Sequence, residues 1–353
     1  MTLTEQRSIS HPVVVLAALV IVIGGLKYAS DLVVPFLLAL FIATISGPPM
    51  TWLNRRGLPM WLSLIIVMLG VFVLILFIVS LMGGSVARFS QDLPQYDALL
   101  RQRFASMATW IESKGFELPT SELLNAINPG TALQLVSGFM NGLGSMMSNG
   151  LMIILMAVFL LFEGSVFSSK IQYLERYSGR DFSKLSQITR DINRYLGIKT
   201  ITSLGTGLLI GLWLYLLDVP YPLLWGTLAF LLNYIPTIGS IIAAVPTVLF
   251  TFLAVNPLTA LWVAVAYLVV NSVIGNILEP MFMGARLGLS ALVVLLSMIF
   301  WGWVFGPVGM FLSVPITMAF KIAMEVSPET QWIGILLGSD LDSKKSQVSE
   351  SEG

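Results

Sequence analysis

The side chains best suited to bind or react with a solute lie between residues 233 and 279 of this 353-residue sequence. The polar candidates there are Asn233, Thr237, Ser240, Asn271, Asn276 and Glu279. Asn276 and Glu279 are three positions apart, so they would share one face of an α-helix. Two interpretations of Glu279 stay open, a functional carboxylate within the membrane or an interfacial residue paired with Arg286. Asn233 and Asn276 are equally compatible with helix packing.

The remaining composition excludes several kinds of site. Cysteine is absent and His11 is the only histidine, which excludes disulfides, thiolate chemistry and multi-histidine metal sites. The 19 basic residues balance the 19 acidic ones, so there is no sign of a nucleic-acid partner. Neither a phosphate-binding loop nor an acid–base pair is visible, so we expect no cofactor, no metal and no enzyme. Transport by such a chain would draw on a gradient rather than on ATP.

The elements that must position the polar residues are apolar. Hydrophobic residues make up 56% of the sequence and charged ones 11%, against about 25% charged in soluble domains. Spans of about 20 apolar residues cross a bilayer as helices. We therefore predict an all-α polytopic membrane protein with six transmembrane helices at Val13–Ser30, Leu32–Leu53, Trp61–Gly83, Leu151–Phe162, Ile201–Leu217 and Leu258–Ile274.

Two further apolar segments, Leu223–Leu253 and Ala291–Phe320, are about 30 residues long, which is too long for one ordinary span. Proline and glycine interrupt both of them, at Pro236, Gly239, Gly306, Pro307 and Gly309. This pattern predicts two re-entrant helical hairpins, whose irregular tips must be buried in protein or line a cavity. Paired broken helices mark the binding site in many secondary transporters. The alternative is that proline and glycine are simply common in membrane helices.

Basic residues favour the cytoplasmic side of a membrane. They predict an inner-membrane protein with both termini in the cytoplasm and hairpins that enter from opposite faces. Residues 1–84 would hold three spans, 85–145 a periplasmic helical region divided by Pro94, Pro119 and Pro129, and 146–169 the fourth span. Residues 170–199 would form a basic cytoplasmic connector, 200–325 the transport region and 326–353 a largely disordered tail. Lys27 is expected to be an interface anchor, and Trp301 and Trp303 to pack within the second hairpin.

Three motifs carry a resemblance to a known family. They are Asn233-Tyr-Ile-Pro236-Thr-Ile-Gly239-Ser240, Gly275-Asn276-Ile-Leu-Glu279-Pro280, and Phe300-Trp301-Gly302-Trp303 followed by Gly306-Pro307-Val-Gly309. Over nearly its whole length the sequence resembles the autoinducer-2 exporter family of bacterial membrane proteins, and most closely its enterobacterial members implicated in quorum signalling and biofilm control.

The resemblance implies export of autoinducer-2, a small polyhydroxylated furanone derivative, by a homopentamer in the lipid bilayer. It also implies two hairpins at the substrate site and an elevator-like movement of the hairpin domain. The residues it carries over as site or hinge positions are Asn233, Pro236, Gly239, Asn276, Glu279, Gly306, Pro307 and Gly309. Some relatives resemble sodium/proton antiporters, in which case Glu279 would be the titrating group. A third hypothesis is an envelope scaffold that acts through residues 85–145.

Overall fold

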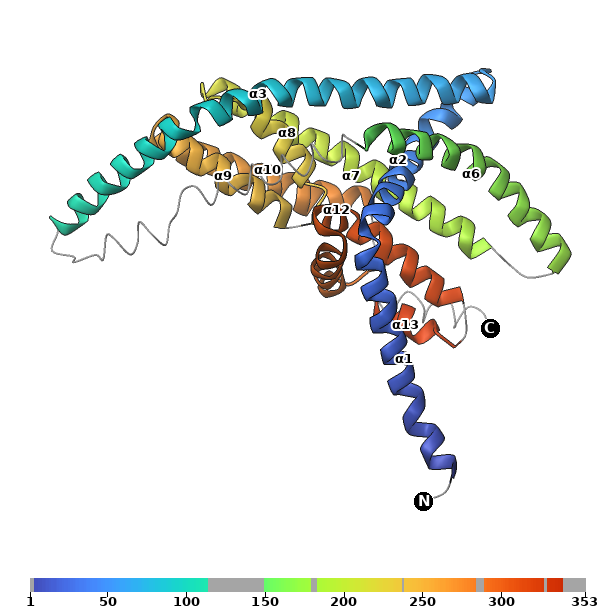
Figure 1. The fold of residues 1–353 in the computed structure, drawn as a ribbon. Coiled ribbons are helices and arrows are strands. Elements are labelled where there is room, and N and C mark those ends of the chain that lie inside the picture. Colours follow the sequence, from blue (N-terminus) through green and yellow to red (C-terminus); the bar gives the residue numbers. More distant parts are fainter. Residues whose placement is uncertain are drawn as a thin grey trace. The chain divides into compact units, whose positions relative to one another are not determined.

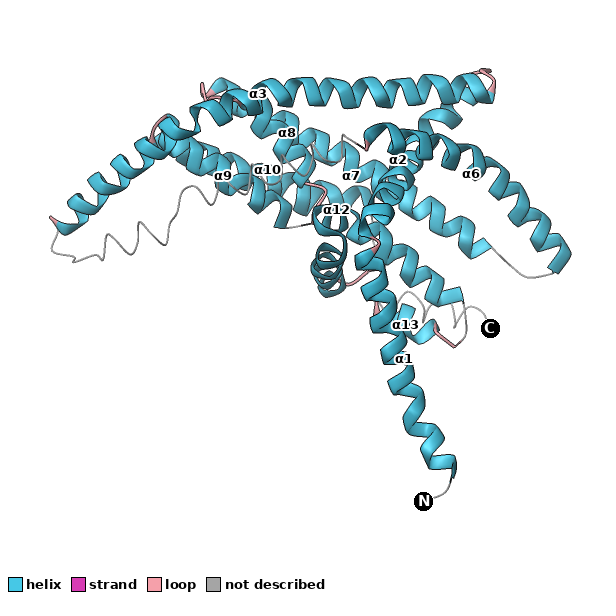
Figure 2. Ribbon diagram, viewed as in Figure 1, coloured by secondary structure: helices cyan, strands magenta, loops and turns pink. Residues whose placement is uncertain are grey.

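The computed structural model describes residues 3–113, 149–178, 183–236, 238–283, 289–326 and 329–338. Within these ranges the chain consists of helices joined by short turns and has no strand (Figure 2), so the predicted all-α fold is confirmed. Among the described residues, five helices are long and apolar enough to cross a membrane, Ser30–Arg55, Met60–Ile78, Arg190–Leu216, Pro257–Phe282 and Ala291–Glu325. The predicted spans Val13–Ser30 and Leu151–Phe162 correspond to shorter apolar helices, Val13–Tyr28 and Gly150–Gly164. Within the predicted tail 326–353, residues 329–338 are described and include the short helix Gln331–Leu336, and the residues after 338 lie outside the described part of the chain.

The chain divides into two compact units. The terminal unit comprises Met1–Thr44, Asn149–Asp181 and Leu289–Gly353, and the central unit comprises Ile45–Ser148 and Phe182–Gly288. The first predicted hairpin belongs to the central unit and the second belongs to the terminal unit. Each unit therefore contains one of the two proline- and glycine-broken segments.

The first hairpin consists of two short helices of the central unit (Figure 1). α8 (Pro222–Leu232) has 11 residues and α9 (Ile238–Ala254) has 17, so they are about 16 and 25 Å long, each less than a bilayer core. The two pack against one another, and α8 also packs along α7 (Ser183–Leu216). After α9 the chain continues as α10 (Pro257–Val270), the π-helix η1 (Asn271–Leu278) and α11 (Glu279–Met283).

Glycines let α7 and α8 approach each other closely. A β-carbon at Gly226 of α8 would lie 2.9 Å from the Gly207 carbonyl oxygen and 2.9 Å from the Gly211 α-carbon of α7. Gly207 and Gly211 are four residues apart, which is the small-residue spacing of close helix pairs in membranes. The backbones of the two helices are therefore in direct contact at this crossing.

An aromatic cluster braces the base of the first hairpin. Phe89 of α3 (Met60–Glu112) lies edge-on to Tyr221, Trp225 and Phe250, with ring centroids 5.6–5.8 Å away. The Tyr221 hydroxyl also donates a hydrogen bond to the Asp92 carboxylate. Aromatic pairs of this geometry contribute about 0.5–1.5 kcal/mol each beyond their burial. The cluster fixes the ends of both hairpin helices to α3.

α3 corrects one expectation about the segment that follows the third predicted span. Pro94 is predicted to divide residues 85–145, but α3 continues as one helix of 53 residues through Pro94 to Glu112. A proline removes one helical hydrogen bond and bends the helix without always ending it, and α3 is visibly bent (Figure 1). Pro119 and Pro129 lie outside the described residues. The basic connector is also largely helical, since α6 spans Gly150–Ser178 and α7 begins at Ser183.

The second hairpin is α12 (Ala291–Val326), which reverses direction within the terminal unit. Gly306 has a non-helical backbone, with φ 65° and ψ −149°. The Trp301 Nε1–H donates a hydrogen bond of 3.0 Å to Thr317 Oγ1, sixteen positions later. In a straight helix residues so spaced would be about 24 Å apart. The two arms of α12 therefore lie side by side, as the sequence predicted.

Neighbouring helices of the terminal unit hold this second hairpin. α1 (Leu3–Tyr28) places the Lys27 ammonium 3.8 Å from the centre of the Trp303 ring. α2 (Ser30–Arg55) places Phe41 edge-on to Phe311, with ring centroids 4.9 Å apart. α13 (Gln331–Leu336) packs on α12. Lys27, expected to be an interface anchor, thus also contacts the hairpin.

Candidate functional site

Both hairpin tips are closed by a glycine that touches backbone. A β-carbon at Gly239 would lie 1.8 Å from the Leu232 carbonyl oxygen, and one at Gly309 would lie 1.9 Å from the Trp301 carbonyl oxygen. Side-chain atoms cannot approach a backbone oxygen so closely. The same contact, between a glycine opening the second arm and a carbonyl near the end of the first, occurs at both tips. It gives a physical reason for glycine at these two positions of the motifs.

The second tip also requires a special backbone conformation. Gly306 has a φ of +65°, which a residue with a side chain rarely adopts. A β-carbon added to Gly306 would have nothing within 4 Å, so the requirement is conformational rather than steric. Pro307 follows as the first residue of the second arm, where its missing N–H leaves no helical hydrogen bond unmade.

The first tip is anchored to α7 by polar side chains. Asn233 is buried, and its Nδ2 donates a hydrogen bond of 3.0 Å to Ser203 Oγ. The hydroxyl of Tyr234, also buried, donates to Thr200 Oγ1 at 2.9 Å. Each such hydrogen bond contributes about 0.5–1.5 kcal/mol net. The contact of Asn233 joins two helices, which fits the prediction that it is a packing residue. Its role as a site residue stays a prediction.

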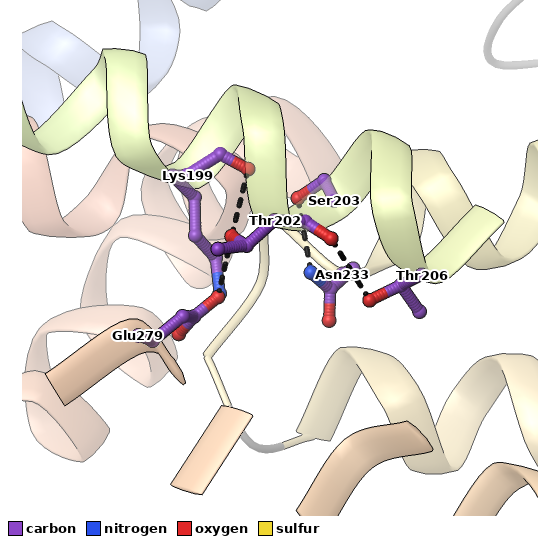
Figure 3. A network of polar contacts seen from close by, with 6 residues as sticks. All are labelled: Lys199, Thr202, Ser203, Thr206, Asn233 and Glu279. Carbon is purple, nitrogen blue, oxygen red and sulfur yellow. Dashed lines mark hydrogen bonds and ion pairs between the residues drawn. The ribbon is translucent and has the colours of Figure 1, made fainter. Parts of the chain in front are cut away.

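On the same turn of α7 as Ser203, Lys199 forms a buried ion pair with Glu279 (Figure 3). Lys199 Nζ is 2.6 Å from Glu279 Oε1, and the two side chains are only 6% and 15% exposed. The Thr202 hydroxyl donates a second hydrogen bond, of 2.9 Å, to the same carboxylate oxygen. Breaking a buried pair by removing one partner costs about 3–5 kcal/mol. Glu279 is therefore a buried carboxylate paired with Lys199, while its predicted partner Arg286 lies outside the described residues.

Glu279 directly follows the π-helix η1, which changes the predicted face. At the end of η1 the Glu279 N–H donates a hydrogen bond to the Ile274 carbonyl, five residues earlier. Residues three apart no longer share a side as they would in an α-helix, and Asn276 is exposed while Glu279 reaches α7. The structure thus separates Asn276 from Glu279. Asn271 is half-buried at the junction of α10 and η1. π-Helical turns occur frequently at functional sites.

One face of α7 carries all of these contacts. Its inward residues are Lys199, Thr200, Thr202, Ser203 and Thr206, of which Thr206 bonds back to the Thr202 carbonyl. On the opposite face Ile201 is 71% exposed and Leu204 is 50% exposed. The sequence prediction places Lys199 in the basic connector and none of the hydroxyls at the site. The signal that could have found them is their spacing, because polar residues at positions 199, 202, 203 and 206 follow a helical period within an apolar span.

The other predicted residues fall at the two tips. Pro236 and Gly239 lie at the first tip, Ser240 is half-buried in the first turn of α9, and Thr237 lies outside the described residues. Gly306, Pro307 and Gly309 form the second tip, in the other unit. The structure therefore brings Asn233 and Glu279 together through α7. A direct role for any of these residues in substrate binding or hinge motion stays a prediction.

We call the cluster of Lys199, Thr202, Ser203, Asn233 and Glu279 the central site. Its groups are suited to binding. It offers hydroxyls, an amide, one carboxylate and one ammonium. Within the described residues no group of three or more His, Asp or Glu is placed to hold a metal ion. Such a set of groups can hold a polar solute or a small ion by hydrogen bonds and charge.

Known proteins resemble the chain over nearly its full length. A putative transport protein of Haemophilus influenzae is 39% identical over 335 residues, which cover 93% of this chain and 96% of the relative. The AI-2 transport protein TqsA of Escherichia coli is 37% identical over 330 residues, covering 94% and 96%. The putative transport protein YhhT of Escherichia coli is 35% identical over 328 residues, covering 93% and 94%.

The sequence profile described as AI-2E family transporter matches residues 16–329, which include both hairpins and the α7 face. Together with the long apolar helices, this match makes the chain a multi-pass membrane protein related to transporters. The chain belongs to the AI-2E transporter family.

Proposed function

We propose that the chain is a secondary transporter that exports autoinducer-2 across the bacterial inner membrane. The observation that carries this proposal is the pair of broken helices with matching tips, at Gly239 and Gly309. Broken helices leave backbone N–H and C=O groups without helical partners, and their partial charges bind polar solutes at membrane depth. TqsA, which is named for AI-2 transport, supports the choice of substrate.

The polar groups beside the first tip suit a small polyhydroxylated solute. Asn233, Thr200 and Ser203 can each donate and accept hydrogen bonds, and they are buried or half-buried. A solute rich in hydroxyls can replace their mutual hydrogen bonds without leaving a buried group unpaired, which keeps the cost of opening the tip low. This argument supports a polar substrate over an apolar one.

The proposal includes a mechanism and an assembly. Alternating access would come from an elevator-like movement of a hairpin domain, within a homopentamer whose subunits have both termini in the cytoplasm. The division of the chain into two contact units, each with one hairpin, is compatible with relative movement of parts. The family resemblance supports the pentamer.

Flux measurements on proteoliposomes test the substrate. We expect the wild-type chain to move autoinducer-2 when a proton or sodium gradient is imposed, and Asn233→Ala to move it at least several-fold more slowly. Tyr215→Phe, at an exposed position of α7 away from the polar face, serves as the control and should match the wild type. If the folded wild-type chain moves no autoinducer-2 in any gradient, the substrate assignment is wrong.

A sodium/proton antiporter is the second candidate, and the buried Lys199–Glu279 pair favours it. A chain that crosses a membrane rarely buries an ionisable pair without a use for it. Ion flux in the absence of autoinducer-2 separates the two candidates. An antiporter exchanges sodium for protons without any other solute and loses this exchange on Glu279→Gln, whereas a coupled exporter requires autoinducer-2 for sustained ion flux.

A further inference from the structure

We propose that the turn between α2 and α3 is a binding site for the headgroup of an anionic phospholipid. Trp52, Arg55, Arg56 and Trp61 form this turn site. The two arginines would hold the lipid phosphate, and the two tryptophans would lie beside the upper part of the lipid. This partner is a component of the membrane, so the site goes beyond the proposed function and does not depend on which solute the chain moves.

The turn site lies where two membrane-length helices meet. Ser30–Arg55 and Met60–Ile78 are each long and apolar enough to cross a membrane. Only residues 56–59 join them, and Gly57 turns the chain with a φ of +93°. A connection this short between two spans places the turn at the membrane surface, in the layer that the lipid headgroups occupy.

The charge of the turn site is positive and uncompensated. Arg55 and Arg56 are both exposed. The sequence from Leu32 to Gln91 contains neither aspartate nor glutamate. No acidic side chain of the described residues forms an ion pair with either arginine. Basic residues next to a membrane helix attract anionic lipids, so the charge of the turn site complements a headgroup phosphate that has no amine of its own.

Trp52 restrains one of the two arginines. The Arg56 N–H donates a hydrogen bond of 3.2 Å to the Trp52 carbonyl oxygen, which places Arg56 one helical turn after Trp52. The guanidinium carbon of Arg56 lies 4.8 Å from the centre of the Trp52 ring, and a cation over an indole face is attracted to it. A guanidinium can bind a phosphate with two parallel hydrogen bonds, and a restrained side chain loses less entropy when it does so.

The exposed tryptophans favour a lipid over a soluble anion. Trp52 is 56% exposed and Trp61 is 59% exposed. One belongs to the last turn of α2 and the other to the first turn of α3. Tryptophan prefers the membrane interface, where its apolar ring meets the acyl chains and its N–H meets the headgroups. A free phosphate ion would use the arginines alone, whereas a phospholipid uses all four side chains.

The junction of α1 and α2 provides a matched control. The Lys27 ammonium there lies 3.8 Å from the centre of the Trp303 ring, so it is also a cation over a tryptophan. Asp31, which is exposed, follows four positions later and balances the charge of this junction. Lys27→Gln therefore removes a cation of the same kind without touching the turn site.

The experiment measures which lipid lies beside the tryptophans of the turn site. The purified full chain is reconstituted into phosphatidylcholine vesicles that contain increasing fractions of brominated phosphatidylglycerol or, in a parallel series, brominated phosphatidylcholine. Bromine quenches nearby tryptophan fluorescence, and the difference between the wild type and a variant with Trp52→Phe and Trp61→Phe isolates the signal of the turn site. We expect half of this signal to be quenched at an about tenfold lower fraction of phosphatidylglycerol than of phosphatidylcholine.

The arginine variants test the cause of this preference. Arg55→Gln combined with Arg56→Gln should abolish the preference for phosphatidylglycerol, whereas Lys27→Gln should keep it. Both arginines are exposed, so we expect the double variant to fold, and circular dichroism checks its helix content. If it yields too little folded protein, each single substitution should weaken the preference several-fold. The proposal is overturned if the wild type shows no preference, or if Lys27→Gln reduces the preference as much as the arginine substitutions do.

Inorganic phosphate distinguishes a lipid headgroup from a soluble anion. Sodium phosphate, compared with sodium chloride at the same ionic strength, should leave the quenching by brominated phosphatidylglycerol unchanged. Displacement of the lipid by inorganic phosphate would overturn the assignment to a lipid. Autoinducer-2 flux tests the proposed function separately, and a chain that moves no autoinducer-2 but keeps the lipid preference leaves the turn site standing.

Discussion

Polar side chains surround the first hairpin tip, whereas aromatic ones surround the second. Asn233 and Tyr234 hydrogen-bond to α7 at the first tip. At the second, Trp301 stacks on Phe305 with ring centroids 5.6 Å apart, and Lys27 covers Trp303. Both tips nonetheless close through the same glycine contact with a carbonyl.

This difference shows that the residues that form the turn are distinct from the residues that surround it. The turn itself depends on backbone packing, which glycine permits in both hairpins. The side chains beyond the turn set whether the hairpin is tied to a buried charge, as the first is through α7, or to aromatic surface, as the second is. Substitutions in the shared part should therefore affect both hairpins alike, and substitutions in the surroundings should not.

The largest expected effect on stability comes from the glycine contact that both hairpin tips share. Gly239→Ala and Gly309→Ala each force a β-carbon to within 2 Å of a backbone oxygen. We expect each to lower the free energy of unfolding by about 3 kcal/mol or more, at the upper end for overpacking, and to reduce the yield of folded protein. Gly197→Ala is the control, because nothing lies within 4 Å of its β-carbon position. Chemical unfolding in micelles measures all three, and equal stability would contradict the shared-tip interpretation.

The next effect is confined to the surroundings of the first hairpin. Glu279→Gln leaves the Lys199 ammonium buried without its counter-charge, and we expect a loss of about 3 kcal/mol in the free energy of unfolding. The double variant with Lys199→Met should recover most of this loss, because no buried charge remains. If the single variant is as stable as the wild type, the pair is not buried as described.

The tie between the first tip and α7 should be smaller but measurable. Asn233→Ala leaves the Ser203 hydroxyl without its donor, at an expected cost of about 1–3 kcal/mol. A double-mutant cycle with Ser203→Ala should show a coupling energy of about 1 kcal/mol. Additive effects of the two substitutions would mean that the hydrogen bond does not hold the tip.

The smallest effect is expected in the second hairpin. Trp301→Phe keeps an aromatic ring but removes the hydrogen bond to Thr317, for about 0.5–1.5 kcal/mol. Thr317→Val should cost a similar amount, and the double variant should cost little more than either. Neither should alter the loss of stability caused by Glu279→Gln in the central unit. Non-additive effects of the two substitutions would show that the two hairpins are coupled.

The two hairpins could be predicted from the sequence because the residues that break the helix are neighbours along the chain. Proline and glycine within an apolar run of about 30 residues disturb the helix wherever the chain folds, and Gly306 turns the chain at the predicted place. The partner of Glu279 was not predictable in the same way, since Lys199 lies 80 positions away. Only the crossing of α7 with η1 and α11 brings them together.

Helix type was a second limit. The prediction that Asn276 and Glu279 share a face assumes an α-helix, and the wider π turn of η1 moves them apart. Pro94 is expected to divide the segment after the third span, yet α3 continues through it as one bent helix (Figure 1), because a proline removes one helical hydrogen bond without always ending the helix. In both cases the local backbone differs from the one that the sequence pattern predicted.

At Gly207, Gly211 and Gly226 no side chain separates the backbones of α7 and α8. A β-carbon at Gly207 or Gly226 would lie less than 3 Å from backbone atoms of the other helix and would push the two helices apart. We therefore expect α7 and α8 to move together as one rigid body. A displacement of α7 at Lys199 is therefore passed to α8, the first arm of the hairpin, through direct backbone contact.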